Sequence, residues 1–310
     1  MEKIRKTRLA SGATGAVFGI MCGVICLIGL AVPAPGLRIV ADETGRSLRL
    51  PDHPHRIVCL APSITDTVYA IGAGADVIAI SDFTLYPAEA LQKPSIGGVL
   101  RPSLERIAVL HPDLAIGIAQ FNDADSIRGI ERLGVPVFLV SPHGIAGLYR
   151  SIESIGRALG RQPEAGSLAG RLRQRERRVR EQASSFLAGK PRPTVFFAIS
   201  LSPCITAGRG AFVTELLEAA GARSVTDDLP REWINLSIEA VVARQPEFVL
   251  LLKDAPFGLP QMRERAGWKS LDAVRAGRVL RVDDRMQYPS PVAFDALEEF
   301  ARQFHEAQRR

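Results

Sequence analysis

The sequence predicts an α/β protein made of two similar lobes joined by one long helix. Three observations support this prediction: short apolar runs alternate with helical patterns, a charged helical stretch spans the middle, and two segments recur in both halves. Alternating strands and helices are typical of parallel sheets covered by helices. The length of 310 residues fits about two domains of ordinary size.

Composition and charge exclude several classes of protein. Hydrophobic residues make up 46% of the chain and charged residues 23%, which excludes a disordered chain, a collagen-like fibre and a multi-span transporter. The net charge of +6 includes four basic residues and one acidic residue before residue 36. The remaining net charge of +3 is scattered along the chain. We therefore expect no nucleic-acid partner.

Residues 1–35 are typical of an export signal. Lys3, Arg5, Lys6 and Arg8 precede a stretch that holds no charge until Arg38. The apolar stretch is also long enough to span a bilayer as a helix of about 20 residues, so attachment to a membrane through residues 9–35 is the alternative. In both cases the basic amino side places the rest of the chain outside the cytoplasm.

Seven apolar runs are predicted as strands and six amphipathic stretches as helices. The strands are residues 56–60, 77–80, 114–118, 137–140, 194–199, 248–252 and 279–282. The helices are residues 64–71, 104–110, 126–133, 212–220, 238–243 and 294–308. Residues 37–50 precede them and predict a hairpin that turns at residues 43–45.

Residues 163–189 predict a single charged helix. Glu176 and Glu181 interrupt its positive run, and no aromatic side chains are interleaved for stacking on bases. We interpret it as a solvated connector between the two halves. The predicted organisation is therefore a signal peptide or membrane anchor (1–35), an N-terminal lobe (36–160), a connecting helix (161–189) and a C-terminal lobe (190–310).

Two segments recur along the chain. Residues 65–73 match residues 214–222, with the Thr, the acid, Ala, Gly and Ala kept at one offset of 149 residues. Residues 103–105 match residues 237–239 at an offset of 134, and each copy has a proline nine residues after its serine. Two copies at such spacing predict two similar lobes rather than a solenoid. The difference between the offsets predicts extra chain in the first lobe, around residues 86–100.

The sequence favours ligand binding over catalysis. It contains no nucleophile elbow, phosphate-loop continuation or paired acid–base motif, so we expect no catalytic residues and no enzyme. The histidines are isolated apart from His53 and His55, so we expect no dedicated metal site and no resident cofactor. We interpret Cys59 and Cys204 as two buried thiols, with a disulfide as the alternative in an exported protein. Ligand is expected between the lobes, at the carboxyl ends of strands.

Several motifs together resemble a known family. They are RIVCLAPSITD at residues 56–66, AIGAG at 70–74, Ser81-Asp82-Phe83, Tyr86-Pro87, Gly97-Gly98, residues 103–107, residues 111–113, and residues 237–241 with Pro246. Over residues 38 to about 305 the chain resembles the periplasmic substrate-binding proteins for vitamin B12 and iron complexes. The resemblance implies two Rossmann-like lobes with limited hinge motion. It also implies delivery of a small-molecule metal complex to an ABC importer, made of a permease dimer with ATPase subunits. The expected location is the periplasm or the outer face of the inner membrane.

The resemblance implies a set of ligand-binding residues. They are Pro62, Ser63, Phe83, Tyr86, Pro203, Cys204, Trp233, Asp284 and Tyr288. A corrinoid is the first interpretation of the ligand, although Val99 and Tyr288 stand where one cobalamin-binding member has tryptophan and arginine. Haem or a ferric siderophore is the second, because the phenolate of Tyr86 or Tyr288 could ligate a haem iron. An exported enzyme or anchored sensor domain is the interpretation from another class.

Glu105 and Glu239 have two interpretations. Ser103 and Ser237 are predicted N-caps, which place each glutamate in the first turn of a helix. A carboxylate there stabilises the helix dipole by about 0.3–1 kcal/mol. Their equivalent positions also fit docking onto the two permease subunits, as the resemblance implies.

Overall fold

The computed structural model describes residues 36–309. The predicted signal peptide or membrane anchor at residues 1–35 lies outside these residues. The described residues belong to one compact unit by their contacts. Within the described residues, no helix has both the length and the hydropathy needed to cross a membrane.

The first lobe contains the predicted hairpin and a parallel sheet. Strands β1 (Leu37–Ala41) and β2 (Ser47–Pro51) pair antiparallel. The parallel sheet has the order β4-β3-β5-β6. Its strands are β3 (Ile57–Cys59), β4 (Val77–Ala79), β5 (Leu114–Ile118) and β6 (Val137–Val140). The helices of this lobe are α1 (Pro62–Ala70), α2 (Leu104–Leu110), α3 (Ala124–Arg132) and α4 (Gly144–Leu159).

Helices cover both faces of this sheet. Ile57 and Cys59 belong to one core cluster and Val58 to another, as expected when successive side chains on a strand point to opposite faces. Ile107 of α2 and Ile130 of α3 share the cluster of Val58. Helices α1 and α4 contribute to the other cluster. This double burial explains why the strands are continuously apolar rather than alternating.

The second lobe has a mixed sheet with the order β10-β8-β7-β11-β12, and β9 also pairs with β7. Its strands are β7 (Thr194–Leu201), β8 (Cys204–Ala207), β9 (Arg223–Ser224), β10 (Trp233–Leu236), β11 (Phe248–Leu252) and β12 (Val279–Val282). Its helices are α6 (Phe212–Ala219), α7 (Ile238–Arg244), α8 (Leu259–Glu264), α9 (Asp272–Arg275) and α10 (Ala293–Gln308). Strands β7, β11 and β12 are parallel, whereas β8 runs antiparallel to its neighbours.

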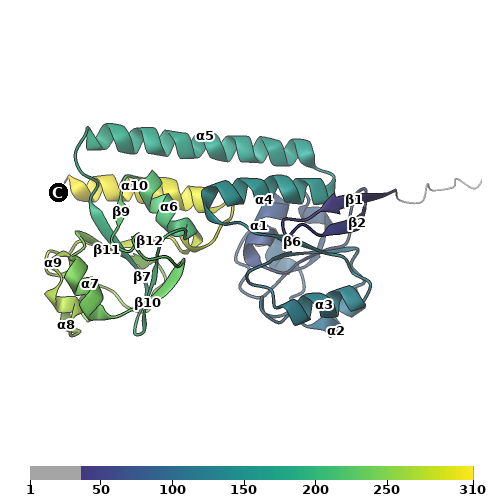
Figure 1. Cartoon of the computed structure of the whole chain (residues 1–310), viewed down its shortest axis with the longest axis horizontal. Helices are drawn as coiled ribbons and strands as arrows, with labels where there is room; N and C mark the ends of the chain where they lie inside the picture. The colour runs from purple at the N-terminus through teal and green to yellow at the C-terminus, as the bar shows by residue number, and fades with distance from the viewer. Residues whose placement is uncertain (1–35, 310) are drawn as a thin grey trace, which may run out of the picture. The chain divides into compact units, whose positions relative to one another are not determined.

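Helix α5 (Gln162–Leu187) bridges the two lobes, as Figure 1 shows. In its first half, Arg173 pairs with Glu153 of α4 at 2.9 Å. At its middle, Arg175 pairs with Glu298 of α10 at 2.8 Å. Its buried side chains, among them Leu168, Leu172 and Val179, recur at helical spacing and form a narrow apolar stripe. The charged residues that remain exposed belong to a solvated face, as the sequence predicted.

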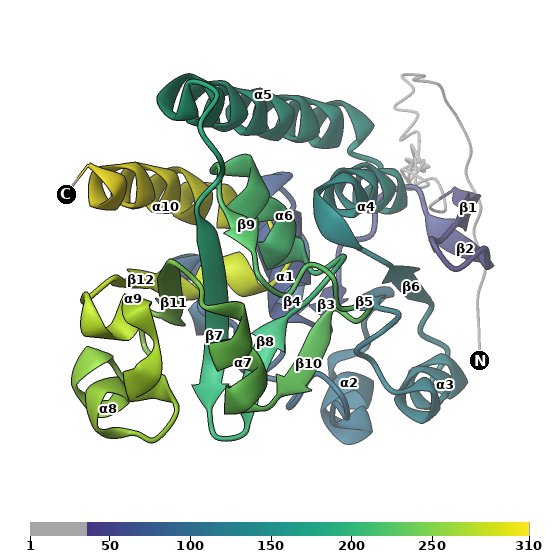
Figure 2. The same ribbon diagram turned by 60° about the vertical axis from the view of Figure 1, so that its left-hand side comes forward.

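The recurring segments adopt the same local structure in both lobes. Helices α2 and α7 each have seven residues, begin at a capping serine and end at a residue in the left-handed conformation. Helices α1 and α6 are each followed by a turn glycine, Gly72 (φ 86°) and Gly221 (φ 87°), a conformation that glycine adopts at little cost. Figures 1 and 2 place α2 and α7 on the side of this unit opposite to α5.

Helix α4 and strands β8 and β10 were not predicted from the sequence. Helix α4 contains three glycines, which weaken a helical pattern. One of them, Gly156, is needed for close packing, because a Cβ there would lie 2.3 Å from the Cβ of Ala165 on α5.

Candidate functional site

Side chains from both lobes meet around Tyr86 and Tyr288. The guanidinium of Arg285 lies 5.4 Å from the centre of the Tyr86 ring, a cation–π contact between the lobes. Asp283 holds Arg285 in place through two hydrogen bonds of 2.8 and 2.9 Å. Burial, together with the nearby Asp66 and Tyr86, raises the pKa of Tyr288 to about 12. The structure therefore brings Tyr86 and Tyr288 together, as the predicted ligand site requires.

Asp66 is a buried acid in this group. Burial raises its pKa to about 7, against the opposing effects of the Ser290 hydroxyl and of Arg285. Within residues 36–309, neither Asp66 Oδ2 nor Ser290 Oγ has a hydrogen-bond partner, although both atoms are buried. A buried carboxyl group without a full set of partners is costly when ionised. Asp66 and Ser290 therefore each have a buried polar atom that could form a further hydrogen bond where the lobes meet.

Exposed aromatic side chains follow the carboxyl ends of two strands in the first lobe. Phe83 comes shortly after β4 and is 79% exposed, and Phe121 comes after β5 and is 45% exposed. Phe83 also has a φ of 66°, in the left-handed region that a bulky residue rarely adopts. Strands β3 and β5 are neighbours although β4 follows β3 in the chain, so the sheet has its switch point there. Ligands of parallel α/β sheets bind at this position.

Pro62 and Ser63 also lie at that edge of the first sheet. They form the first turn of α1, directly after β3 and Leu60-Ala61, with Ser63 buried. Of the residues predicted in the first lobe, Phe83 and Tyr86 therefore offer exposed surface, whereas Ser63 is buried.

The residues predicted in the second lobe are more widely spread. Pro203 is exposed in the turn between β7 and β8, and Cys204 begins β8 as a buried thiol. Trp233 pairs with Ala207, three positions along β8 from Cys204, which corresponds to about 10 Å. The half-buried Trp233 packs against the core. Cys59 and Cys204 are both free, so the interpretation as separate buried thiols is confirmed.

Trp233 nevertheless lies at the boundary between the lobes. The preceding residue, Glu232, accepts a hydrogen bond through its Oε1 atom from Nδ1 of His143 in the first lobe, at 2.7 Å. Asp284 lies in the short helical turn after β12, half-buried, and burial and Asp254 raise its pKa. Among the described residues, no hydrogen bond or ring contact joins Pro203 or Cys204 to the Tyr86–Tyr288 group.

Sequence reasoning missed Asp66, Phe121 and Ser290, whereas Arg285 lies within the stretch from Asp284 to Tyr288 that the resemblance implies as part of the cleft lining. A signal for Asp66 was present, because the repeat aligns it with Glu215, which also contacts the opposite lobe. Phe121 could have been found as an aromatic residue just after a predicted strand. Ser290 follows Tyr288 outside the helices and strands, and no sequence pattern distinguishes it.

Glu105 and Glu239 occupy equivalent first-turn positions on α2 and α7. Ser103 Oγ accepts the Arg106 N–H at 3.3 Å, and Ser237 Oγ accepts the Ala240 N–H at 3.2 Å. The predicted N-caps are therefore confirmed. Both glutamates are exposed, and within residues 36–309 neither has an ion-pair partner.

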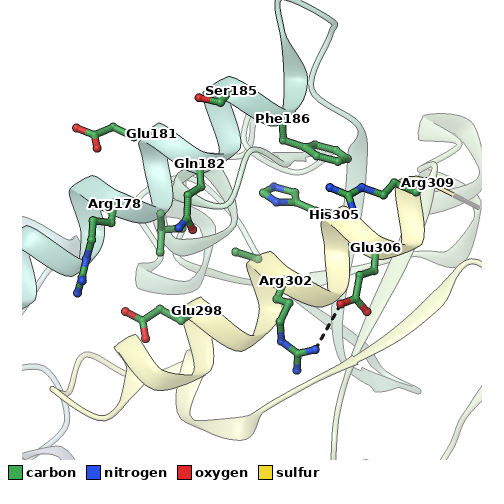
Figure 3. Close-up of a pocket in the computed structure, with 12 residues that line it drawn as sticks. Arg178, Glu181, Gln182, Ser185, Phe186, Glu298, Arg302, His305, Glu306 and Arg309 are labelled. Carbon is green, nitrogen blue, oxygen red and sulfur yellow. Dashed lines mark hydrogen bonds and ion pairs between the residues drawn. The ribbon is translucent and has the colours of Figure 1, made fainter.

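A separate groove of about 1040 Å³ lies between α5 and α10. Figure 3 shows its charged walls and the His305 ring, which stacks on Phe186 with 4.3 Å between ring centres. None of the predicted ligand-binding residues lines this groove. Among the described residues, no group of three or more His, Cys, Asp or Glu side chains is arranged to hold a metal ion.

The two sheets, the bridging helix and the residues that meet between the lobes define a bilobed ligand-binding protein. A model of the periplasmic binding protein family matches residues 57–286, and the chain belongs to this family. Members of the family serve ABC importers as substrate-binding components and are in general not enzymes.

Known proteins resemble the chain over most of its length. It is 26% identical over 271 residues to an uncharacterized ABC transporter substrate-binding lipoprotein of Bacillus subtilis, covering 86% of this chain and 85% of that protein. It is 28% identical over 270 residues to a vitamin B12-binding protein of Vibrio parahaemolyticus, covering 85% and 94%. A periplasmic haem-binding protein from Roseiflexus sp. RS-1 superposes with a TM-score of 0.74 at 27% identity, covering 82% and 98%.

Proposed function

We propose that this chain is the extracytoplasmic substrate-binding component of an ABC importer, which captures a corrinoid of the cobalamin type between its lobes. The observation that carries the proposal is the set of exposed aromatic side chains that follow the carboxyl ends of β4 and β5 in the first sheet, namely Phe83, Tyr86 and Phe121. A flat macrocycle offers a large apolar face that such side chains can cover. The similarity to a vitamin B12-binding protein over 94% of that protein's length supports the corrinoid.

Haem is the second candidate ligand. It is favoured by the two tyrosines that meet between the lobes, because a tyrosine phenolate is a known axial ligand of haem iron. The phenol of Tyr288 is protonated at neutral pH, and burial raises its pKa further, so iron binding there would have to release a proton. The similarity to a periplasmic haem-binding protein supports this candidate.

Titration of the purified protein with cyanocobalamin and with hemin, by calorimetry and absorption spectroscopy, distinguishes the candidates. Binding of cyanocobalamin alone supports the corrinoid. Binding of hemin with a spectral shift that disappears in Tyr86→Phe or Tyr288→Phe supports haem. Tyr149→Phe is the matched control, because the Tyr149 hydroxyl is bonded to Glu176 on the bridging helix. Binding of neither probe contradicts both assignments.

The proposed location is the periplasm, either free or anchored through residues 9–35. The proposed partners are a permease dimer and its ATPase subunits, which Glu105 and Glu239 contact from the two lobes. Their position on α2 and α7, on the same side of the unit and opposite to the bridging helix, supports this role (Figure 1).

A further inference from the structure

The large hydrophobic side chains that are strongly exposed cluster in one lobe of the described chain. Within residues 36–309, every large hydrophobic side chain that is strongly exposed lies between residues 37 and 133. Five of these residues lie between 83 and 100, around the stretch where the two repeat offsets differ. Single exposed hydrophobic residues need no explanation, but an asymmetry between two otherwise similar lobes does.

One part of this surface adjoins Glu105. A shallow groove of about 480 Å³, which we call the α2 groove, is lined by Pro94, Ser95, Glu105, Arg106, Val109 and Leu110. Val109 is 78% exposed and follows Glu105 by four residues, so both side chains lie on the same face of α2. Arg106 is turned back onto the carbonyl oxygen of Ser95 at 3.1 Å. The groove thus presents an apolar wall with an unpaired carboxylate at its edge.

At the matching place the second lobe has side chains of different size and charge. At the repeat offset of 134 residues, Ala243 replaces Val109 and Arg244 replaces Leu110 on a helix of the same length and capping. Arg244 is engaged within its own lobe, with the carbonyl oxygen of Val225 at 3.0 Å and with Asp228 at 3.1 Å. Glu239 therefore has an exposed carboxylate, but positions 243 and 244 next to it hold no large apolar side chain.

We propose that the α2 groove is part of the docking surface for the importer's permease and receives an apolar side chain that lies next to the cation paired with Glu105. The proposal rests on the proposed function, because it takes Glu105 as a docking residue. Glu105 and Val109 are one helical turn apart, about 6 Å along the axis, so the permease segment must carry a basic and an apolar side chain at similar spacing. Burying the apolar pair excludes water from the neighbouring charge pair and strengthens it.

An unequal contribution of the two lobes follows from this geometry. The first lobe makes a partly desolvated contact that holds the complex together, whereas the second makes an exposed charge contact that mainly steers association. Loss of a desolvated contact is expected to increase the dissociation rate, and loss of an exposed charge to reduce the association rate.

The test is Val109→Asp, with Ile39→Asp as the matched control. Both wild-type residues are strongly exposed aliphatic side chains, and Ile39 lies on β1, away from α2 (Figure 2). Binding of each full-length variant to the purified permease–ATPase complex in nanodiscs is measured by surface plasmon resonance. We expect at least tenfold weaker docking for Val109→Asp and less than a twofold change for Ile39→Asp. Val109→Leu is expected to dock as the unmodified protein does.

Comparison with the double variant Glu105→Ala, Glu239→Ala separates this inference from the proposed function. If the double variant docks poorly while Val109→Asp docks normally, the α2 groove has no docking role but the proposed function stands. If both dock normally, the proposed docking by the two glutamates fails as well. Sedimentation tests whether a second copy of this chain occupies the groove instead. If the unmodified protein forms a dimer that Val109→Asp loses while its docking stays normal, the inference is overturned in favour of self-association.

Discussion

Asp66 and Glu215 occupy equivalent positions in the two lobes, and each carboxylate lies against the opposite lobe. Glu215, on α6, accepts the N–H of Ile145 at 2.7 Å and so caps α4, whose own N-cap residue provides no side-chain hydrogen bond. Asp66, on α1, lies beside Ser290, which shortly precedes α10, but its Oδ2 atom has no partner within the described chain. The aspartate is one methylene shorter than the glutamate. The carboxylate of Glu215 therefore forms a hydrogen bond with the opposite lobe, whereas the Oδ2 atom of Asp66 forms none within the described chain.

We expect Asp66→Glu to stabilise the protein and Glu215→Asp to destabilise it. A longer side chain at position 66 brings the carboxylate closer to the Ser290 hydroxyl, which has no partner within the described chain, and would add a charge-assisted hydrogen bond worth about 1 kcal/mol. Shortening Glu215 withdraws its carboxylate from the Ile145 N–H and should cost about 1–2 kcal/mol. Urea unfolding at pH 8 measures both changes. A less stable Asp66→Glu variant would show that the site cannot accommodate the extra methylene.

The stability of the protein should also depend on pH through Asp66. Its pKa is raised to about 7 in the folded state, whereas the ordinary value is 3.8. Between about pH 4 and pH 7 the folded protein holds a proton that the unfolded chain has lost, so this group lowers stability as the pH rises. The slope is at most about 1.4 kcal/mol per pH unit, and it ends above pH 7.

Asp66→Asn removes the pH dependence that Asp66 contributes. The free energy of unfolding of this variant, minus that of the unmodified protein, should therefore increase from pH 4 to pH 7 and then level off. Urea unfolding across this range measures the difference. Asp125→Asn, at an exposed position on α3, is the control and should give a difference that stays constant. A constant difference for Asp66→Asn as well would mean that Asp66 titrates normally.

Phe83 should contribute to ligand binding and not to stability. Its side chain is exposed, and its left-handed backbone is one that glycine adopts with less strain. Phe83→Ala should weaken binding of the ligand identified by titration by roughly 1–3 kcal/mol, the value of an aromatic contact at the centre of an interface. Phe83→Gly should bind as weakly but unfold at a higher temperature than Phe83→Ala. Unchanged calorimetric affinity in both variants would remove Phe83 from the site.

The sequence predicted the parallel strands and the repeat well because both depend on local patterns. The predicted strand at residues 114–118 and helix at residues 104–110 match β5 and α2 residue for residue. Strand β8 was missed because it has only four residues and follows β7 after the short turn at residues 202–203. Strand β10 was missed because it pairs with β8, which is more distant in sequence, and has little buried surface. Propensity does not reveal such pairing, which tertiary contacts decide.

The candidate site was predictable only in part. Tyr86 and Tyr288 were named from the resemblance, and the structure places them together. The residues that set their surroundings, Asp66 and Arg285, act through contacts between the lobes. Such contacts depend on how two separately folded sheets are oriented, which no periodicity in either half records. The roles of the ligand-binding and docking residues stay predictions until the experiments above are carried out.

The last prediction separates delivery of the ligand from its capture. Glu105 and Glu239 are exposed at the starts of α2 and α7, whereas the proposed ligand surface lies at the strand ends between the lobes. The double variant Glu105→Ala, Glu239→Ala should therefore keep its ligand affinity within about twofold, while docking to the permease and ligand uptake decline together. If the two carboxylates only stabilise their helix dipoles, the variant should instead lose about 0.3–1 kcal/mol of stability for each residue and transport normally. The matched control is Glu164→Ala with Glu181→Ala, which removes two exposed carboxylates of the bridging helix and leaves α2 and α7 unchanged. Ligand affinity, melting temperature and uptake measured on the same preparations decide between the two roles, and normal uptake with reduced stability would exclude docking.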